Sequence, residues 1–315
     1  MAVDISICGR KIFFLFPPPL IKNEVIEILS RAEYEVYCVQ DPERMKMLLS
    51  HFPESMVYIN VDTYMTQAEW LTYVKKLRQT VATEETIFSL LTNSGNEEYK
   101  RKLVYDFEAK GGILSVRTDI KATVETILTQ LNQYKCHGRR KYIRAYCEND
   151  NLAKLNFIFN EQKYDLRIRD ISVFGTCAFF PGSLRIPIKP KQLIKNALLS
   201  LRGLNISCDI VVFNINEEEY SSTFVFLFSN FSESSGKDKI RKYVRQNLQA
   251  KMDSIISYAE EEKKDTPKEN APETATENKD QGKTEEKPES ENPPDEKKDD
   301  ASKDGNNNLG GILAF

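Results

Sequence analysis

The sequence is poor in the residues that most often perform catalysis or bind transition metals. Only two histidines, His51 and His137, occur in 315 residues, and none of the six cysteines forms a CxxC pair. Cys136 and His137 are adjacent, but no second ligand pair follows at zinc spacing. No nucleophile–base–orienter set and no glycine-rich phosphate loop is recognisable. We therefore predict a protein with reduced thiols that is not an enzyme and holds no metal and no cofactor.

Long apolar runs are missing as well. The longest candidate near the start, IFFLFPPPLI, is short and is broken by three consecutive prolines at residues 17–19. It lacks a cleavage pattern, which excludes a secretory signal, and no stretch is long enough to span a bilayer. These absences predict a cytoplasmic protein without membrane insertion.

The formal net charge of the chain is only −3, but the charge is unevenly spread. Residues 259–315 contain 17 acidic and 9 basic residues, a net charge of −8, so residues 1–258 carry +5. A mildly basic body attracts an anionic ligand, although it is not basic enough to predict binding of duplex nucleic acid. Residues 259–315 are too polar to form a core, which predicts a disordered acidic tail.

Residues 1–135 alternate between strand-like and helix-like patterns. Each apolar run is followed by an amphipathic stretch with helical spacing, which predicts five consecutive βα units and a doubly wound α/β domain. The expected strands are KIFFLF, EVYCV, MVYINV, TIFSLL and GGILSV, at residues 11–16, 35–39, 56–61, 86–91 and 111–116.

Five such units, with AKGGILSVRTD at the fifth strand, resemble the response-regulator receiver family. That family places an acidic pair after the first strand, where residues 16–18 here read FPP. Asn60 stands at the position of the phosphorylated aspartate, and Asp62 lies beyond it. Val116 occupies the lysine position, with Arg117 one residue away. Without converging carboxylates the resemblance implies a degenerate interaction domain; phosphorylation of Asp62 is the alternative.

Residues 136–258 have a different pattern. Residues 136–145 lack a helical stripe and predict a linker. Short segments rich in β-branched and aromatic residues then predict an antiparallel barrel or sandwich. These segments are LNFIF, YDLRIRDISVFG, TCAFF, SLRIPI, ALLSLRGL, CDIVVFNI and TFVFLFS. A closing helix begins at Gly236, and its apolar stripe is expected to pack on the barrel; its members are Ile240, Val244, Leu248 and Ile255.

Two phrases occur twice. RKYIR at residues 140–144 is nearly repeated as RKYVR at 241–245, and DISVFG at 170–175 as DISICG at 4–9. RKYVR lies within the closing helix, which predicts an ordinary solvated face. DISICG precedes every RxxxR sequence. RKYIR lies in the linker before the barrel, and DISVFG follows it at the end of a predicted strand. Because only these two copies have the expected order and surroundings, we expect them to belong together.

That arrangement, followed by the strand-rich body and the closing helix, resembles the PilZ domain family. The resemblance implies that the chain binds cyclic di-GMP through RxxxR and [DN]xSxxG, here Arg140, Arg144, Asp170, Ser172 and Gly175. An arginine fork matches the O6 and N7 atoms of guanine, or grips a phosphate.

The remaining positions have expected roles of their own. Asp170 accepts hydrogen bonds from the N–H groups of a guanine edge, and Ser172 donates to a phosphate. Gly175 lets the backbone approach the ligand and adopt a positive φ. Arg139 is adjacent and is expected to add a phosphate contact. The alternative is that the arginines are solvated linker charges and that Asp170 to Ser172 form a simple turn.

We therefore predict a cyclic di-GMP receptor built from a receiver-like α/β domain (1–135), a PilZ-like β-barrel with a closing helix (136–258) and a tail (259–315). Ligand binding orders the linker 136–145 and changes how the first domain sits on the barrel, and the output passes to a protein partner. Motility is a usual output of the family. The alternative is a ligand-independent adaptor that acts by protein–protein interaction.

Overall fold

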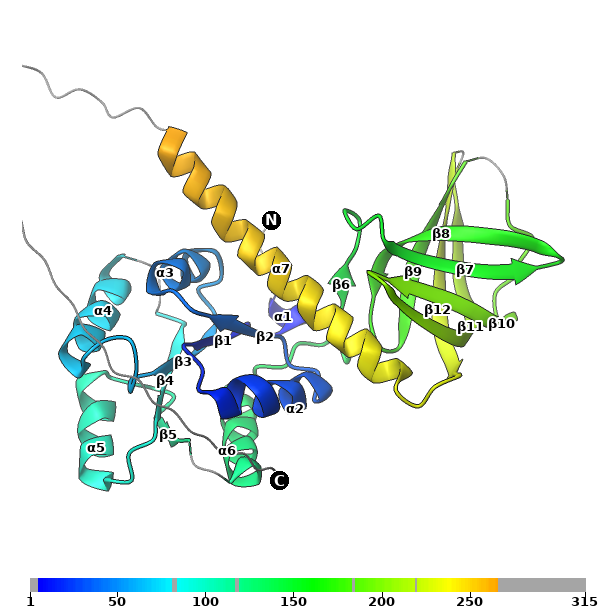
Figure 1. The fold of residues 1–315 in the computed structure, drawn as a ribbon. Coiled ribbons are helices and arrows are strands. Elements are labelled where there is room, and N and C mark those ends of the chain that lie inside the picture. The colour runs from blue at the N-terminus through cyan, green and yellow to red at the C-terminus, as the bar shows by residue number, and fades with distance from the viewer. Residues whose placement is uncertain (1–4, 81–83, 117–118, 183–184, 219, 266–315) are drawn as a thin grey trace, which may run out of the picture. The chain divides into compact units, whose positions relative to one another are not determined.

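The structure is a computed structural model that describes residues 5–80, 84–116, 119–182, 185–218 and 220–265 (Figure 1). Residues 1–267 form one compact unit. It begins with a short helix, α1 (Ile5–Cys8), where the sequence repeats the DISICG phrase. The predicted tail lies outside the described residues except for 259–265, which form the end of the last helix instead.

A five-stranded parallel sheet forms the first domain and confirms the predicted doubly wound fold. Its strand order is β2-β1-β3-β4-β5, the flavodoxin-like order. The central strands are buried on both faces because helices cover both, which explains their continuous apolar runs. The strands are β1 (Ile12–Leu15), β2 (Val36–Val39), β3 (Met56–Asn60), β4 (Ile87–Thr92) and β5 (Ile113–Ser115).

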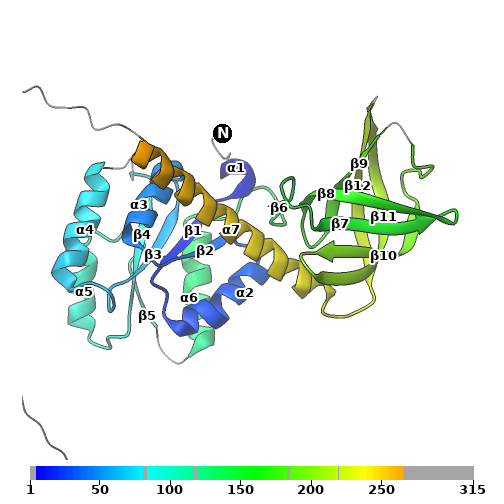
Figure 2. The ribbon, with the colours of Figure 1, turned by 45° about the horizontal axis from the view of Figure 1, so that its top comes forward.

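The helices of this domain cover the two faces of the sheet in separate groups (Figure 2). A π-helical turn, η1 (Ile21–Val25), leads into α2 (Ile26–Arg31), and both pack with α6 (Ile120–Gln133) on one face. The other face is covered by α3 (Pro42–His51), α4 (Gln67–Thr80) and α5 (Glu97–Asp106). Asp41 caps α3 by accepting a hydrogen bond from the Glu43 N–H at 2.8 Å, with Pro42 at the first helical position as expected.

The second domain is a closed antiparallel barrel, as predicted. Strands β8, β7, β10, β11, β12 and β9 pair in that order, and a β8–β9 pairing closes the ring. Their inward side chains alternate with outward ones, so one apolar core fills the interior. The strands are β7 (Ala153–Phe159), β8 (Gln162–Ile171), β9 (Gly175–Pro181), β10 (Leu193–Leu201), β11 (Leu204–Glu217) and β12 (Ser221–Phe231).

The expected strand SLRIPI is wrong for its described part, residues 185–188, which have no regular secondary structure. Proline lacks the N–H that a ladder needs, and Pro187 and Pro190 punctuate the segment. Ile186 and Ile188 are nevertheless buried in the barrel core. The apolar pattern therefore predicted correctly that these side chains are buried, but it predicted a strand where the backbone is irregular.

The closing helix α7 (Gly236–Asp265) serves both domains, whereas the prediction placed its stripe on the barrel alone. Ile240 and Val244 belong to the barrel core, and Leu248 packs against both cores. One turn further on, Met252 and Ile255 pack into the core formed by β1, β2 and α3. Within the described residues, no helix combines the length and the apolarity that crossing a bilayer requires.

Candidate functional site

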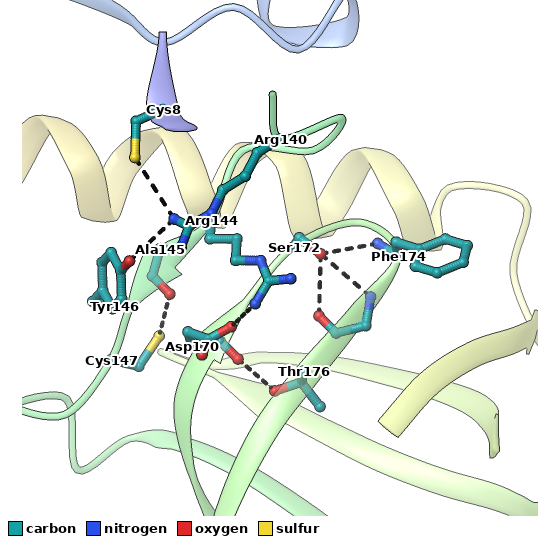
Figure 3. A network of polar contacts seen from close by, with 11 residues as sticks. Cys8, Arg140, Arg144, Ala145, Tyr146, Cys147, Asp170, Ser172, Phe174 and Thr176 are labelled. Carbon is teal, nitrogen blue, oxygen red and sulfur yellow. Dashed lines mark hydrogen bonds and ion pairs between the residues drawn. The ribbon is translucent and has the colours of Figure 1, made fainter. Parts of the chain in front are cut away.

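The two phrases that were expected to belong together lie side by side. The linker ends in a two-residue strand, β6 (Ala145–Tyr146), which pairs with the end of β8 so that Tyr146 lies opposite Asp170. This pairing places Arg144 beside Asp170, with 3.1 Å between Nη1 and Oδ1 (Figure 3). The Arg144 side chain is 46% exposed and that of Asp170 is 19% exposed, so the arginine remains partly accessible to solvent despite the ion pair.

A second tie joins the linker to the turn that follows β8. Tyr142 of the linker stacks on Phe174 with ring centroids 5.2 Å apart and an angle of 5° between the rings. Phe174 belongs to the turn between Ser172 and Gly175, so the aromatic pair holds the two phrases together independently of the ion pair. Offset stacking of this kind contributes about 0.5–1.5 kcal/mol beyond the buried area.

Ser172 is buried, and its hydroxyl is occupied inside the turn. The oxygen accepts hydrogen bonds from the N–H groups of Phe174 and Gly175 at 3.3 and 3.4 Å. The hydroxyl also lies 3.3 Å from the carbonyl oxygen of Gly175, as a donor. This is the local turn that the sequence left open as the alternative for this segment. The expected phosphate contact of Ser172 stays a prediction.

Gly175 has a structural role that the sequence analysis did not anticipate. The expected positive φ is wrong, since the glycines with positive φ lie elsewhere in the described chain. A Cβ at Gly175 would lie 2.3 Å from the carbonyl oxygen of Phe226 on the neighbouring strand β12. The glycine is needed there because β9 and β12 approach each other too closely for a side chain.

The DISICG copy, which the sequence analysis set aside, is docked on the arginine linker. The N–H of Arg139 donates to the Ser6 carbonyl oxygen at 2.9 Å, and that of Arg140 donates to the Ile7 carbonyl oxygen at 3.1 Å. A Cβ on Gly138 would lie 2.4 Å from the Gly9 nitrogen. The two segments cross so closely that the glycine of each is required.

Arg140 extends from this crossing toward the barrel. Its Nη1 lies 3.2 Å from the hydroxyl oxygen of Tyr146 and 3.6 Å from the Cys8 sulfur (Figure 3). The hydrogen bond to Tyr146 favours the charged form and raises the pKa of Arg140. Arg139, the additional expected contact, is exposed and reaches the Ser6 hydroxyl at 3.2 Å.

Arg140 and Arg144 both line a cavity of about 320 Å³, which falls in the size range of small-molecule sites. The structure thus brings these two arginines to one cavity, while Asp170, Ser172 and Gly175 lie outside its lining. The other contributors come from α1, the first domain, the linker with β6, and α7. They include Ile7, Cys8, Lys11, Glu33, Glu35, Tyr37, Phe52, His137, Tyr142, Tyr146, Lys251 and Met252.

The acidic side chains of the cavity already have cationic partners. Glu35 pairs with Lys11 and accepts a hydrogen bond from Tyr37, and Glu33 pairs with Arg241 at 3.4 Å. Burial raises the pKa of Glu33, which the hydrogen bond from Ile143 and the charge of Arg241 oppose. The cavity wall is therefore not a carboxylate surface that would repel an anion.

The Glu33–Arg241 pair corrects the prediction for the RKYVR copy. Arg241 was expected on a solvated helix face, yet its side chain is only 24% exposed and links α7 to the turn after α2. Its second ion pair is with Asp238 at 3.0 Å. Helical spacing shows that two arginines share a face, but it does not show which other element lies opposite that face.

The sequence analysis missed two further residues of the cavity, and only one of them carried a weak signal in the sequence. Tyr146 follows the second linker arginine by two residues and is 49% exposed. Lys251 lies on α7, far along the chain, with its Nζ 5.3 Å from the centroid of the Tyr146 ring. An aromatic residue directly behind an arginine pair could have suggested a stacking surface, but no local pattern could have associated Lys251 with it.

In the described part of the receiver-like domain, both candidate phosphorylation positions form hydrogen bonds; Asp62 is exposed, and its phosphorylation stays a prediction. Asn60 is buried and its amide donates to the Phe16 carbonyl oxygen at 2.9 Å. The Asp62 carboxylate accepts hydrogen bonds from the Thr92 hydroxyl, at 2.8 Å, and from the Asn93 N–H. Arg117 lies outside the described residues. Nowhere in the described ranges do three or more His, Cys, Asp or Glu side chains gather as metal ligands.

Comparison with known proteins leaves the family open. No family model matches the chain. No curated protein matches it either. Among solved structures, the Bacillus subtilis inhibitor of motility MotI (DgrA) is similar with a TM-score of 0.30 and 15% identity over 36% of this chain and 52% of that chain. This chain therefore spans about half of MotI.

Two other solved structures are covered almost over their whole length by the match. The PilZ domain of Escherichia coli YcgR with c-di-GMP has a TM-score of 0.26 and 17% identity, over 41% of this chain and 99% of that chain. The Vibrio cholerae chemotaxis protein CheY4 has a TM-score of 0.32 and 22% identity, over 40% of this chain and 99% of that chain. At this level of similarity, function has to be argued from the site itself.

Proposed function

We propose that the chain is a receptor for cyclic di-GMP that has no catalytic activity of its own. One observation carries this proposal: Arg140 and Arg144 enter the same cavity from one linker, and Arg144 is held beside Asp170. Two arginine forks four residues apart offer guanine or phosphate two planar sets of donors at once. In this proposal the carboxylate of Asp170, beside Arg144, accepts hydrogen bonds from the guanine edge that bears N–H groups.

A ligand bound at the linker can affect both domains, because the linker contacts both of them. The linker contacts α1 on one side and β8 on the other, and Glu33 accepts a hydrogen bond from the linker N–H of Ile143 at 3.1 Å. A ligand that reorganises the linker therefore changes contacts of both domains. We propose that the resulting arrangement is what a protein partner recognises.

The test is calorimetric titration of cyclic di-GMP into the full chain and into Arg140→Ala and Arg144→Ala. Loss of one bidentate contact is expected to weaken binding by about 1–3 kcal/mol. Arg241 is unsuitable as the control because its ion pairs hold α7 in place. Arg101→Ala is the matched control, since Arg101 is exposed on α5 and does not line the cavity.

Unchanged affinity in both linker variants would contradict the site, and a wild type that does not bind would contradict the receptor proposal. In the second case the ligand-independent adaptor becomes the function to pursue. Incubation with cyclic di-GMP followed by chromatography of the nucleotide separates receptor from enzyme, because a receptor returns the ligand intact.

A further inference from the structure

The cations that line the cavity fall into two classes. Lys11 and Arg144 each form an ion pair, with Glu35 and Asp170. Arg140 and Lys251 have no carboxylate within ion-pair distance among the described residues, and each contacts Tyr146 instead. Unpaired cations around a cavity are the groups that remain available to an anionic ligand.

Tyr146 lies between these two cations. Its hydroxyl accepts from Arg140 at 3.2 Å, and the ammonium of Lys251 lies over its ring at 5.3 Å from the centroid. Tyr146 is 49% exposed as a residue, and it lines the cavity. A half-exposed aromatic ring with a flexible lysine over its face is a surface on which a planar base can stack once the lysine moves.

From this geometry we infer that Tyr146 and Lys251 form a further part of the ligand site, with Tyr146 stacking a purine base and Lys251 binding a phosphate. The base takes the ring face that Lys251 covers in the free protein. The ammonium, on its four-carbon stem, moves to the phosphate of the same ligand. This inference rests on the proposed function, because it assigns these two residues to cyclic di-GMP.

Tyr146 and Lys251 belong to segments that pack in different cores, so a ligand that contacts both side chains connects the two domains. Tyr146 lies on β6 at the rim of the barrel. Lys251 lies on α7, directly before Met252, which is buried in the core of the first domain. A ligand that contacts both side chains therefore connects the barrel rim to the part of α7 that belongs to the other core. The site is thus composite, with the closing helix supplying a ligand contact.

The experiment is calorimetric titration of cyclic di-GMP into full-length Tyr146→Ala, Tyr146→Phe, Lys251→Gln and Lys251→Arg. Stacking on one aromatic ring predicts a Kd about 5- to 150-fold higher for Tyr146→Ala. Tyr146→Phe keeps the ring and is expected to keep most of the affinity. Lys251→Gln weakens binding, and its difference from the wild type shrinks as KCl is raised, because salt screens the lost charge. Lys251→Arg restores binding.

Lys242→Gln is the matched control for Lys251, since Lys242 is exposed on α7 and does not line the cavity. Tyr105→Ala is the control for Tyr146, since Tyr105 is 83% exposed on α5. Circular dichroism confirms that each variant is folded.

The outcomes separate this inference from the proposed function. A wild type that fails to bind overturns the proposed function and the inference together. Wild-type binding with unchanged affinity in Tyr146→Ala and Lys251→Gln overturns the inference alone. An equal loss in Tyr146→Phe and Tyr146→Ala would show that the hydroxyl only positions Arg140, which also overturns the stacking role.

Discussion

At the scale of single residues, the motif positions divide into those that face the cavity and those that build the turn beside it. Arg140 and Arg144 present donors to the cavity. Ser172 and Gly175 instead stabilise the backbone, through the turn hydrogen bonds and through the close approach of β12. A motif can therefore be required for a site without each member touching the ligand.

Glu33 is the residue at which pH should act. Burial raises its pKa above the ordinary value of 4.5, so the folded chain holds this proton more tightly than the unfolded chain. The contribution of Glu33 to stability is therefore greatest below pH 4.5 and is lost as the pH rises through the raised pKa. In Glu33→Gln the group does not titrate, and its side-chain oxygen still accepts from Ile143.

We therefore expect the free energy of unfolding of the wild type, minus that of Glu33→Gln, to increase when the pH is lowered from about 7 to about 5. Urea unfolding at both pH values measures this difference. Glu98→Gln, at an exposed position on α5, controls for the change of charge. A difference that is constant, or that decreases toward low pH, would contradict the assignment.

At the scale of elements, α7 is the helix that belongs to two cores. Its first turns pack into the barrel through Ile240 and Tyr243, and the hydroxyl of Tyr243 donates to Asp150 at 2.8 Å. Later turns pack on the first domain, where the Gln249 amide bonds both the Cys38 N–H and its carbonyl oxygen. Loss of a contact on the later turns should therefore destabilise a domain that precedes α7 by more than a hundred residues.

Met252→Ala tests this expectation. Met252 is 5% exposed, and truncation of such a buried side chain costs about 2–5 kcal/mol. Trp70, the single tryptophan, is fully buried in the same core, so its fluorescence reports unfolding of the first domain. We expect the Trp70 transition in Met252→Ala to move to lower urea, while Gln246→Ala, at an exposed position of α7, leaves it unchanged. An unshifted Trp70 transition in Met252→Ala would mean that α7 does not stabilise the first domain.

At the scale of the whole molecule, several polar and close contacts join the linker and α7 to the first domain, and three of them lie near the cavity. These are the crossing at Gly9 and Gly138, the hydrogen bond of Ile143 with Glu33, and the ion pair of Glu33 with Arg241. Each involves the linker or the helix that flanks the cavity. A ligand can shift the arrangement only if it binds one arrangement more tightly than another.

Small-angle scattering of the full chain measures this shift. We expect cyclic di-GMP at a concentration that saturates the wild type to change its scattering curve. At the same ligand concentration the curve of Arg144→Ala, which binds more weakly, is expected to stay unchanged. Binding by calorimetry together with an unchanged wild-type curve would show that the signal leaves the protein by another route, such as a surface created by the ligand itself.

The sequence by itself determined the two kinds of fold, a parallel α/β sheet followed by an antiparallel barrel, and it indicated that RKYIR and DISVFG lie together. Periods of 3.6 and 2 are local properties of the chain, and they predicted five βα units and most of the barrel strands. The resemblance to a family predicted that the arginine motif and the DISVFG motif form one site. In the structure Arg144 lies beside Asp170. Where local signals conflicted with proline chemistry, as at residues 185–188, the pattern predicted burial and missed the backbone.

Only the tertiary structure decided which distant segments meet. Arg140 and Cys8 are 132 positions apart, and Arg241 and Glu33 are 208 apart, so no periodicity relates them. The same holds for Lys251 over Tyr146 and for the strand that excludes a side chain at Gly175. Such contacts form only when whole helices and strands pack against each other. The spacing of residues along the chain does not indicate which elements will pack together.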